Sequence, residues 1–128
     1  MTASKNFRKF TTSEGTQVLA GKSAEQNELI IRQAEPEEFV LHTAEPGSPF
    51  CNIKGTATQQ DIKETAVFCA RYSRDWKEKQ SNVEVHVFKR SDICKEKGMK
   101  IGTFGVKKHK SIMVKKEEIK RFIAKEAK

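Results

Sequence analysis

Short apolar runs separated by turn signals dominate the first half of the chain. Runs at 7–10 and 17–20 flank a turn at 13–16 that contains glycine, and this arrangement predicts a β-hairpin. Further runs at 39–42 and 50–53 lie on either side of a segment that contains two prolines and a glycine. They therefore predict two more strands joined by a turn.

Periodicities of three and four residues predict the helices. The S-x-x-Q pattern at 23–26 is typical of a capping box and predicts the start of a helix that Pro36 would stop. A second capping pattern at 58–61 precedes apolar residues at helical spacing, and it predicts one long helix over 58–79. A shorter periodic segment predicts a helical tail over 116–128.

Together these elements predict an α+β fold. Valines alternate with other residues over 83–88, which adds a half-buried strand. We expect a small, mostly antiparallel sheet with two or three helices, and the long central helix packed on that sheet. At 128 residues the chain is expected to form a single domain, residues 1–128.

The excess of positive charge is confined to residues 89–116. This segment has ten Lys or Arg against two acidic residues, a net charge of +8, which equals that of the whole chain. Because apolar residues and glycines are interleaved with the charges, we predict a folded β-hairpin in which 101–106 pairs with 112–114 and the turn lies in 107–110. A folded surface with this much unbalanced positive charge suggests a polyanionic partner.

Composition indicates to which class of protein the chain belongs. No apolar run approaches the roughly 20 residues of a membrane span, and the first ten residues lack the apolar region of a secretory signal. Cys51, Cys69 and Cys94 are scattered and odd in number, which is typical of reduced thiols in a cytoplasmic protein. The three Cys and three His lack metal-ligand spacing, so we expect no metal and no cofactor.

Four motifs, in this order, resemble the NFACT-R domain of the NFACT ribosome quality-control proteins, over about residues 7–114. The first, G-[RK]-x-A-x-x-N, is matched at Gly21, Lys22, Ala24 and Asn27, and the second, [LV]-H-x-x-x-P-G-S-H, at His42, Pro46, Gly47 and Ser48. The third is a helix that ends in Tyr72-Ser73, and the fourth is a basic strand and loop with Lys89, Arg90, Lys97 and Gly98 in register. Pro49 stands where the family has a second His and Val40 where it usually has Trp. These departures put in doubt any activity that depends on the Pro-Gly-Ser loop.

The resemblance implies an α+β fold and binding to structured RNA, either transfer RNA or ribosomal RNA, at the ribosome or in an RNA-processing complex. The cations expected to contact phosphates are Lys89, Arg90, Lys95, Lys97, Lys100, Lys107, Lys108 and Lys110. A second group of candidate RNA-binding residues comprises Lys22, Asn27, His42, Gly47 and Ser48. Phe104 or Phe88 could stack on a base, although either could equally belong to the core. Because lysine far outnumbers arginine in the last forty residues, we expect backbone and shape recognition with little sequence specificity.

Three alternatives remain open from the sequence. His42 and Ser48 could form a base–nucleophile pair in an RNA-modification enzyme or enzyme subunit, although no third triad member is apparent. The same basic face could bind duplex DNA, or it could be a solvated surface without a ligand. We favour a non-catalytic RNA-binding module, and the sequence leaves the oligomeric state undetermined.

Overall fold

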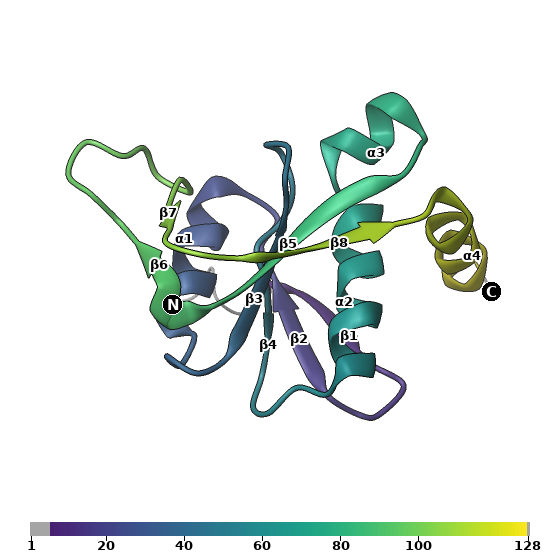
Figure 1. Ribbon diagram of the computed structural model, residues 1–128, viewed down its shortest axis with the longest axis horizontal. Coiled ribbons are helices and arrows are strands. Elements are labelled where there is room, and N and C mark those ends of the chain that lie inside the picture. Colours follow the sequence, from purple (N-terminus) through teal and green to yellow (C-terminus); the bar gives the residue numbers. More distant parts are fainter. Residues whose placement is uncertain (1–5, 128) are drawn as a thin grey trace.

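The computed structural model describes residues 6–127, which form one six-stranded antiparallel sheet, a separate two-stranded sheet and four α-helices (Figure 1). The strands are β1 (Arg8–Thr11), β2 (Gln17–Ala20), β3 (Phe39–Thr43), β4 (Cys51–Ile53), β5 (Val83–Lys89), β6 (Ile93–Cys94), β7 (Gly105–Val106) and β8 (Lys110–Val114). The helices are α1 (Ala24–Gln33), α2 (Gln59–Arg71), α3 (Arg74–Lys79) and α4 (Lys116–Glu126). The order in the large sheet is β1-β2-β4-β3-β5-β8, and β6 pairs with β7. The predicted α+β fold is confirmed, and the last residue of the predicted tail, Lys128, lies outside the described residues.

Both faces of the large sheet are covered, by different elements. Leu41 packs in a core with residues of α2, α3 and α4, whereas its neighbour Val40 packs in a second core with α1 and β6. Successive residues of a strand point to opposite faces, so these two cores lie on opposite sides of the sheet. Figure 1 shows α1 on one side of β2, β3 and β4 and α2 on the other. No helix among residues 6–127 is both long and apolar enough to span a membrane.

The predicted helix starts are confirmed, but the long helix is broken. Ser23 caps α1, and Thr58 forms a capping box with Asp61 at the start of α2. The prediction of one helix over 58–79 is wrong, because α2 ends at Arg71 and Ser73 caps a new helix, α3, by accepting a hydrogen bond from the amide of Trp76. Helical spacing continues across the break, so periodicity alone could not reveal it.

The predicted basic hairpin is also wrong. β8 pairs with β5 at the edge of the large sheet, with Val85 opposite Ile112, while β7 pairs with β6. Val114 is buried in the core beside Val83 and Val85. Pairing with β5 places Val114 in this core and removes its apolar surface from water, which favours this partner for β8. The basic segment is therefore divided between two sheets.

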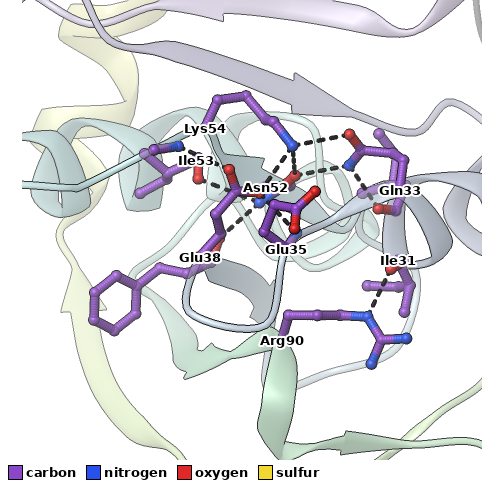
Figure 2. Close-up of polar contacts among 11 residues, drawn as sticks. Ile31, Gln33, Glu35, Glu38, Asn52, Ile53, Lys54 and Arg90 are labelled. Atoms are coloured by element: carbon purple, nitrogen blue, oxygen red, sulfur yellow. Dashed lines mark hydrogen bonds and ion pairs between the residues drawn. The ribbon is translucent and has the colours of Figure 1, made fainter.

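A buried polar network ties α1 to the sheet (Figure 2). Asn52 is fully buried, and its Oδ1 accepts hydrogen bonds from Gln33 Nε2 at 2.7 Å and Lys54 Nζ at 3.2 Å. Lys54 Nζ also forms an ion pair with Glu38 at 2.8 Å. Burial acts to raise the pKa of Glu38, but hydrogen bonds from the Gly55 amide and Lys54 outweigh burial and leave it lowered. Each polar group of the network has a partner, which is the condition under which buried polarity is tolerated.

Asp61 joins the β1–β2 turn to the start of α2. Its fully buried carboxylate accepts hydrogen bonds from Thr12 Oγ1 at 2.7 Å, Thr16 Oγ1 at 2.9 Å and the Thr58 amide at 3.1 Å. Burial acts to raise the pKa of Asp61, but these bonds outweigh it and the net pKa is lowered. The ionised carboxylate therefore stabilises the folded state.

We expect Asp61→Asn to lower the free energy of unfolding at pH 7 by about 2–3 kcal/mol, because charge-assisted bonds to a buried group are lost. Since the folded-state pKa is lowered, the benefit of the native carboxylate is complete above its unfolded pKa of about 3.9. It is lost as the pH falls through the lower folded-state pKa. Urea unfolding of the native protein and the Asp61→Asn variant at a series of pH values measures the difference between their free energies of unfolding. Asp75→Asn is the control, since Asp75 pairs with Lys79 across one helical turn at 3.5 Å and has no other ion pair within residues 6–127. An Asp61→Asn effect as small as that of the control would contradict the assignment.

Candidate nucleic-acid interface

A cleft of about 740 Å³ opens at the end of the large sheet where β3 turns into β4. Its walls come mainly from the start of α1, the β3–β4 turn at 44–50, the α2–α3 junction, and the segment at 101–106 that leads into and includes β7, and residues of β1, β3 and β5 also line it. In Figure 1 this is the upper end of the sheet, between α1 and α3. We call it the basic cleft, for the cations that line it.

The charge of the basic cleft has one sign. Arg8, Lys22, Arg74 and Lys77 line it, and none of the described lining residues is Asp or Glu. The guanidinium of Arg8 lies 4.0 Å from the centroid of the Tyr72 ring. The charged groups of Lys22, Arg74 and Lys77 have no ion pair or hydrogen bond within the described chain. Unpaired cations facing a concave surface attract polyanions strongly, because field lines are focused there.

Glu28 of α1 holds one wall of the cleft in place. Its carboxylate accepts hydrogen bonds from Lys95 Nζ and from the amide of Gly102, which is 2.7 Å away. Burial acts to raise the pKa of Glu28, but the bonds from Lys95 and Gly102 outweigh it, so the pKa is lowered and the carboxylate is ionised at neutral pH. Gly102 has a φ of +78°, and a Cβ there would lie 2.9 Å from the Cα of Ala24. Only glycine therefore allows this segment to approach α1 so closely.

The Pro-Gly-Ser motif forms a second wall, and its polar groups serve the turn itself. Ser48 Oγ accepts a hydrogen bond from the Thr43 amide at 3.0 Å and donates one to the Pro49 carbonyl at 3.1 Å. Gly47 has a φ of +94°, and its carbonyl accepts a hydrogen bond from the Arg74 amide at 2.8 Å. The motif thereby fixes the start of α3 and, with it, Arg74.

Asn27 joins α1 to the same end of the sheet. Its Oδ1 accepts a hydrogen bond from the Phe50 amide at 3.1 Å. A Cβ on Gly21 would lie 2.2 Å from that oxygen, so glycine is required before α1 as well. The G-x-x-A-x-x-N pattern is thus explained by packing between the helix start and β4.

His42 lies in the cleft as a neutral ring. Burial lowers its pKa more than the hydrogen bond to Thr43 raises it, and the nearby His86 lowers it further. Because a carbonyl can only accept, His42 Nδ1 donates its proton to the Thr43 oxygen at 2.7 Å, which leaves Nε2 as an acceptor. No hydrogen bond joins His42 to Ser48 among the described residues, so the structure does not assemble the base–nucleophile pair that the sequence left open.

The cations predicted from the basic segment divide into two groups. Three of them have partners within the protein: Lys89 Nζ pairs with Glu37 at 3.0 Å on the surface, Arg90 Nε donates to the Ile31 carbonyl at 2.6 Å, and Lys95 binds Glu28. The other five are exposed, and their ammonium groups have no partner within the described chain: Lys97, Lys100, Lys107, Lys108 and Lys110. None of these eight lines the basic cleft. The cleft instead contains the second group of candidates, Lys22, Asn27, His42, Gly47 and Ser48.

Sequence reasoning missed three cations of the cleft. Arg8 lies in β1, and Arg74 and Lys77 lie in the short helix that was predicted as part of a longer one. The spacing of Arg74 and Lys77, three residues apart, does place them on one helix face and was a usable signal. Both predicted stacking residues line the cleft, but Phe88 is a core residue, 4% exposed, whereas Phe104 is partly exposed. No group of three His, Cys, Asp or Glu within residues 6–127 is arranged to hold a metal ion.

Known proteins resemble this chain over most of its length. The family described as NFACT protein RNA binding domain matches residues 6–108. The archaeal Rqc2 homolog aRqcH of Methanocaldococcus jannaschii is 33% identical over 91 residues, which cover 68% of this chain and 14% of that protein. The solved C-terminal part of the fibronectin/fibrinogen-binding protein from Streptococcus suis superposes with a TM-score of 0.78 at 20% identity, over 90% of this chain and 48% of that one. This chain belongs to the NFACT protein RNA binding domain family.

Proposed function

We propose that this protein is a non-catalytic module that binds structured RNA, transfer RNA or ribosomal RNA, through its phosphates. The observation that carries the proposal is the basic cleft, where Arg8, Lys22, Arg74 and Lys77 come together without a carboxylate among the described lining residues. The five unpartnered lysines between 97 and 110 extend the positive charge outside the cleft. Lysine ammonium groups bind phosphates as point charges and do not make bidentate hydrogen bonds to base edges. The affinity is therefore expected to depend little on the base sequence of the RNA.

The setting we propose is translation in the cytoplasm. The family match supports RNA binding, and the similarity to an archaeal Rqc2 homolog supports a connection with ribosome quality control. Because the chain spans only 14% of that relative, partners such as the ribosome belong to this proposal and are not carried over from it.

Removing cations from the cleft should weaken RNA binding. We expect Arg74→Gln with Lys77→Gln to lower affinity for transfer RNA about tenfold at 0.1 M salt, and to reduce the slope of log affinity against log salt by about one for each lost phosphate contact. Fluorescence anisotropy over a salt series measures both quantities. Lys107→Gln with Lys108→Gln and Lys110→Gln tests the lysines outside the cleft in the same assay.

The matched control is Lys63→Gln with Lys120→Gln and Lys125→Gln, which removes three exposed lysines from α2 and α4. Its affinity should stay within about twofold of the native protein, since these positions lie outside the cleft. Equal losses in the control and the Arg74/Lys77 variant would indicate attraction to net charge alone and would contradict the proposed site. Duplex DNA of matched length, measured in parallel, distinguishes RNA from DNA binding.

Ser48→Ala should destabilise the protein without abolishing RNA binding. The substitution leaves the Thr43 amide without its acceptor, which is expected to cost about 1–3 kcal/mol of unfolding free energy. Bulk transfer RNA incubated with the native protein should show no modified or cleaved product by mass spectrometry. A product that is formed by the native protein and disappears with Ser48→Ala, while affinity persists, would establish the enzyme alternative instead.

A further inference from the structure

The basic cleft also contains an apolar surface, which phosphate binding does not require. Ile101 is 54% exposed and lines the cleft, beside the partly exposed ring of Phe104. Within the described residues, the other large apolar side chain with this degree of exposure is Met113, 56% exposed, which lies on β8 outside the cleft. Ile101 and Phe104 therefore give the cleft an apolar surface that a ligand could cover.

The ring of Phe104 is fixed before any ligand binds. It packs edge to face on Phe50, with ring centroids 5.4 Å apart, and Lys95 Nζ lies 4.6 Å from its centroid. Lys95 is itself held by Glu28 and by the carbonyls of Lys100 and Thr103. A ring held on several sides loses little conformational freedom when a flat ligand stacks on it.

His42 adds a hydrogen-bond acceptor to this apolar surface. Its ring packs on Phe50 at a centroid distance of 4.3 Å, and its Nδ1 is occupied by the Thr43 carbonyl. The remaining nitrogen, Nε2, can therefore accept a hydrogen bond from a ligand. The amino groups of nucleobases and the ribose 2′-hydroxyl are donors of this kind.

We propose that the basic cleft takes an unpaired nucleotide of RNA, with its base against Phe104 and Ile101 and its phosphates on Lys22, Arg74 and Lys77. This inference rests on the proposed RNA binding and specifies which part of the RNA enters the cleft. Bases inside a duplex are stacked on both faces, whereas an unpaired base offers a free face to an aromatic ring. The volume of about 740 Å³ lies within the range of roughly 300–1,000 Å³ that is usual for small-ligand pockets. A single nucleotide suits both the apolar and the cationic surfaces of the cleft, because it joins a flat apolar base to a charged phosphate.

The test compares two RNAs built on the same hairpin, one blunt and one with a four-nucleotide single-stranded 3′ tail. A third RNA carries the same tail without its bases, so that it matches the phosphates alone. We expect the native protein to bind the tailed RNA about tenfold more tightly than the blunt one, and the base-free tail to lose most of that advantage. A fluorescent adenine analogue in the tail should be quenched on binding, which reports stacking directly.

Two variants and one control assign the effect to the cleft. Phe104→Leu keeps an apolar side chain against Phe50 but removes the flat ring, and Ile101→Ala alters an exposed side chain without touching the core. Both should reduce the advantage of the tailed RNA by about threefold or more, measured in each variant as the ratio of its affinities for the tailed and blunt RNAs. Met113→Ala, which alters the comparable exposed side chain outside the cleft, should leave both affinities unchanged.

The possible outcomes distinguish the nucleotide site from the proposed RNA binding on which it rests. Equal binding of blunt and tailed RNA by the native protein, with no quenching, would overturn the nucleotide site and leave phosphate-mediated RNA binding intact. An advantage for the tailed RNA that survives both Phe104→Leu and Ile101→Ala would also overturn it, because the base would then bind elsewhere. Absence of binding to any of the RNAs would refute the RNA-binding proposal as well.

Discussion

The interaction of Glu28 with Lys95 and the Gly102 amide is the contact on which the basic cleft depends. It supplies the hydrogen bonds between α1 and the segment 95–104, and these help to place the wall that carries Ile101 and Phe104. One carboxylate thereby gathers a lysine, a glycine amide and a helix start into a fixed arrangement. Because the bonds to Glu28 favour its ionised form, the contact is maintained at neutral pH.

Negative and positive charges lie at opposite ends of the sheet. Carboxylates at the end opposite the cleft are committed to buried networks: Asp61 to three hydrogen bonds at the start of α2, and Glu38 to Lys54 and Gly55. At the cleft, by contrast, cations face solvent without carboxylates among the described lining residues. These two carboxylates are held in buried networks, and none lines the cleft among the described residues, so the cleft is locally positive.

The last part of the chain completes the fold although the family match ends before it, at residue 108. β8 adds an edge strand to the sheet beside β5, and Ile119 of α4 is fully buried in the core with α2. Glu126, near the end of α4, accepts hydrogen bonds from Arg71 Nε and the Tyr72 hydroxyl, and the Tyr72 ring lies against Arg8 of the cleft. The C-terminal helix therefore supports one side of the cleft through Tyr72 as well as covering the sheet.

The sequence by itself determined the local elements, the α+β class and the motif residues at the start of α1 and in the β3–β4 turn, because caps, turns and periodicities are set by neighbouring residues. It did not determine which strand β8 pairs with, since that choice depends on a long-range comparison of apolar surface between β5 and the basic segment. Nor did periodicity reveal that α2 ends at Arg71, because helical spacing continues past the Ser73 cap, and the Arg74 amide is bonded to the Gly47 carbonyl, which is distant in the sequence. The cleft itself was decided by tertiary structure alone: Arg8, Lys22 and Arg74 lie far apart in the chain, and only the folded sheet brings their charges to one place.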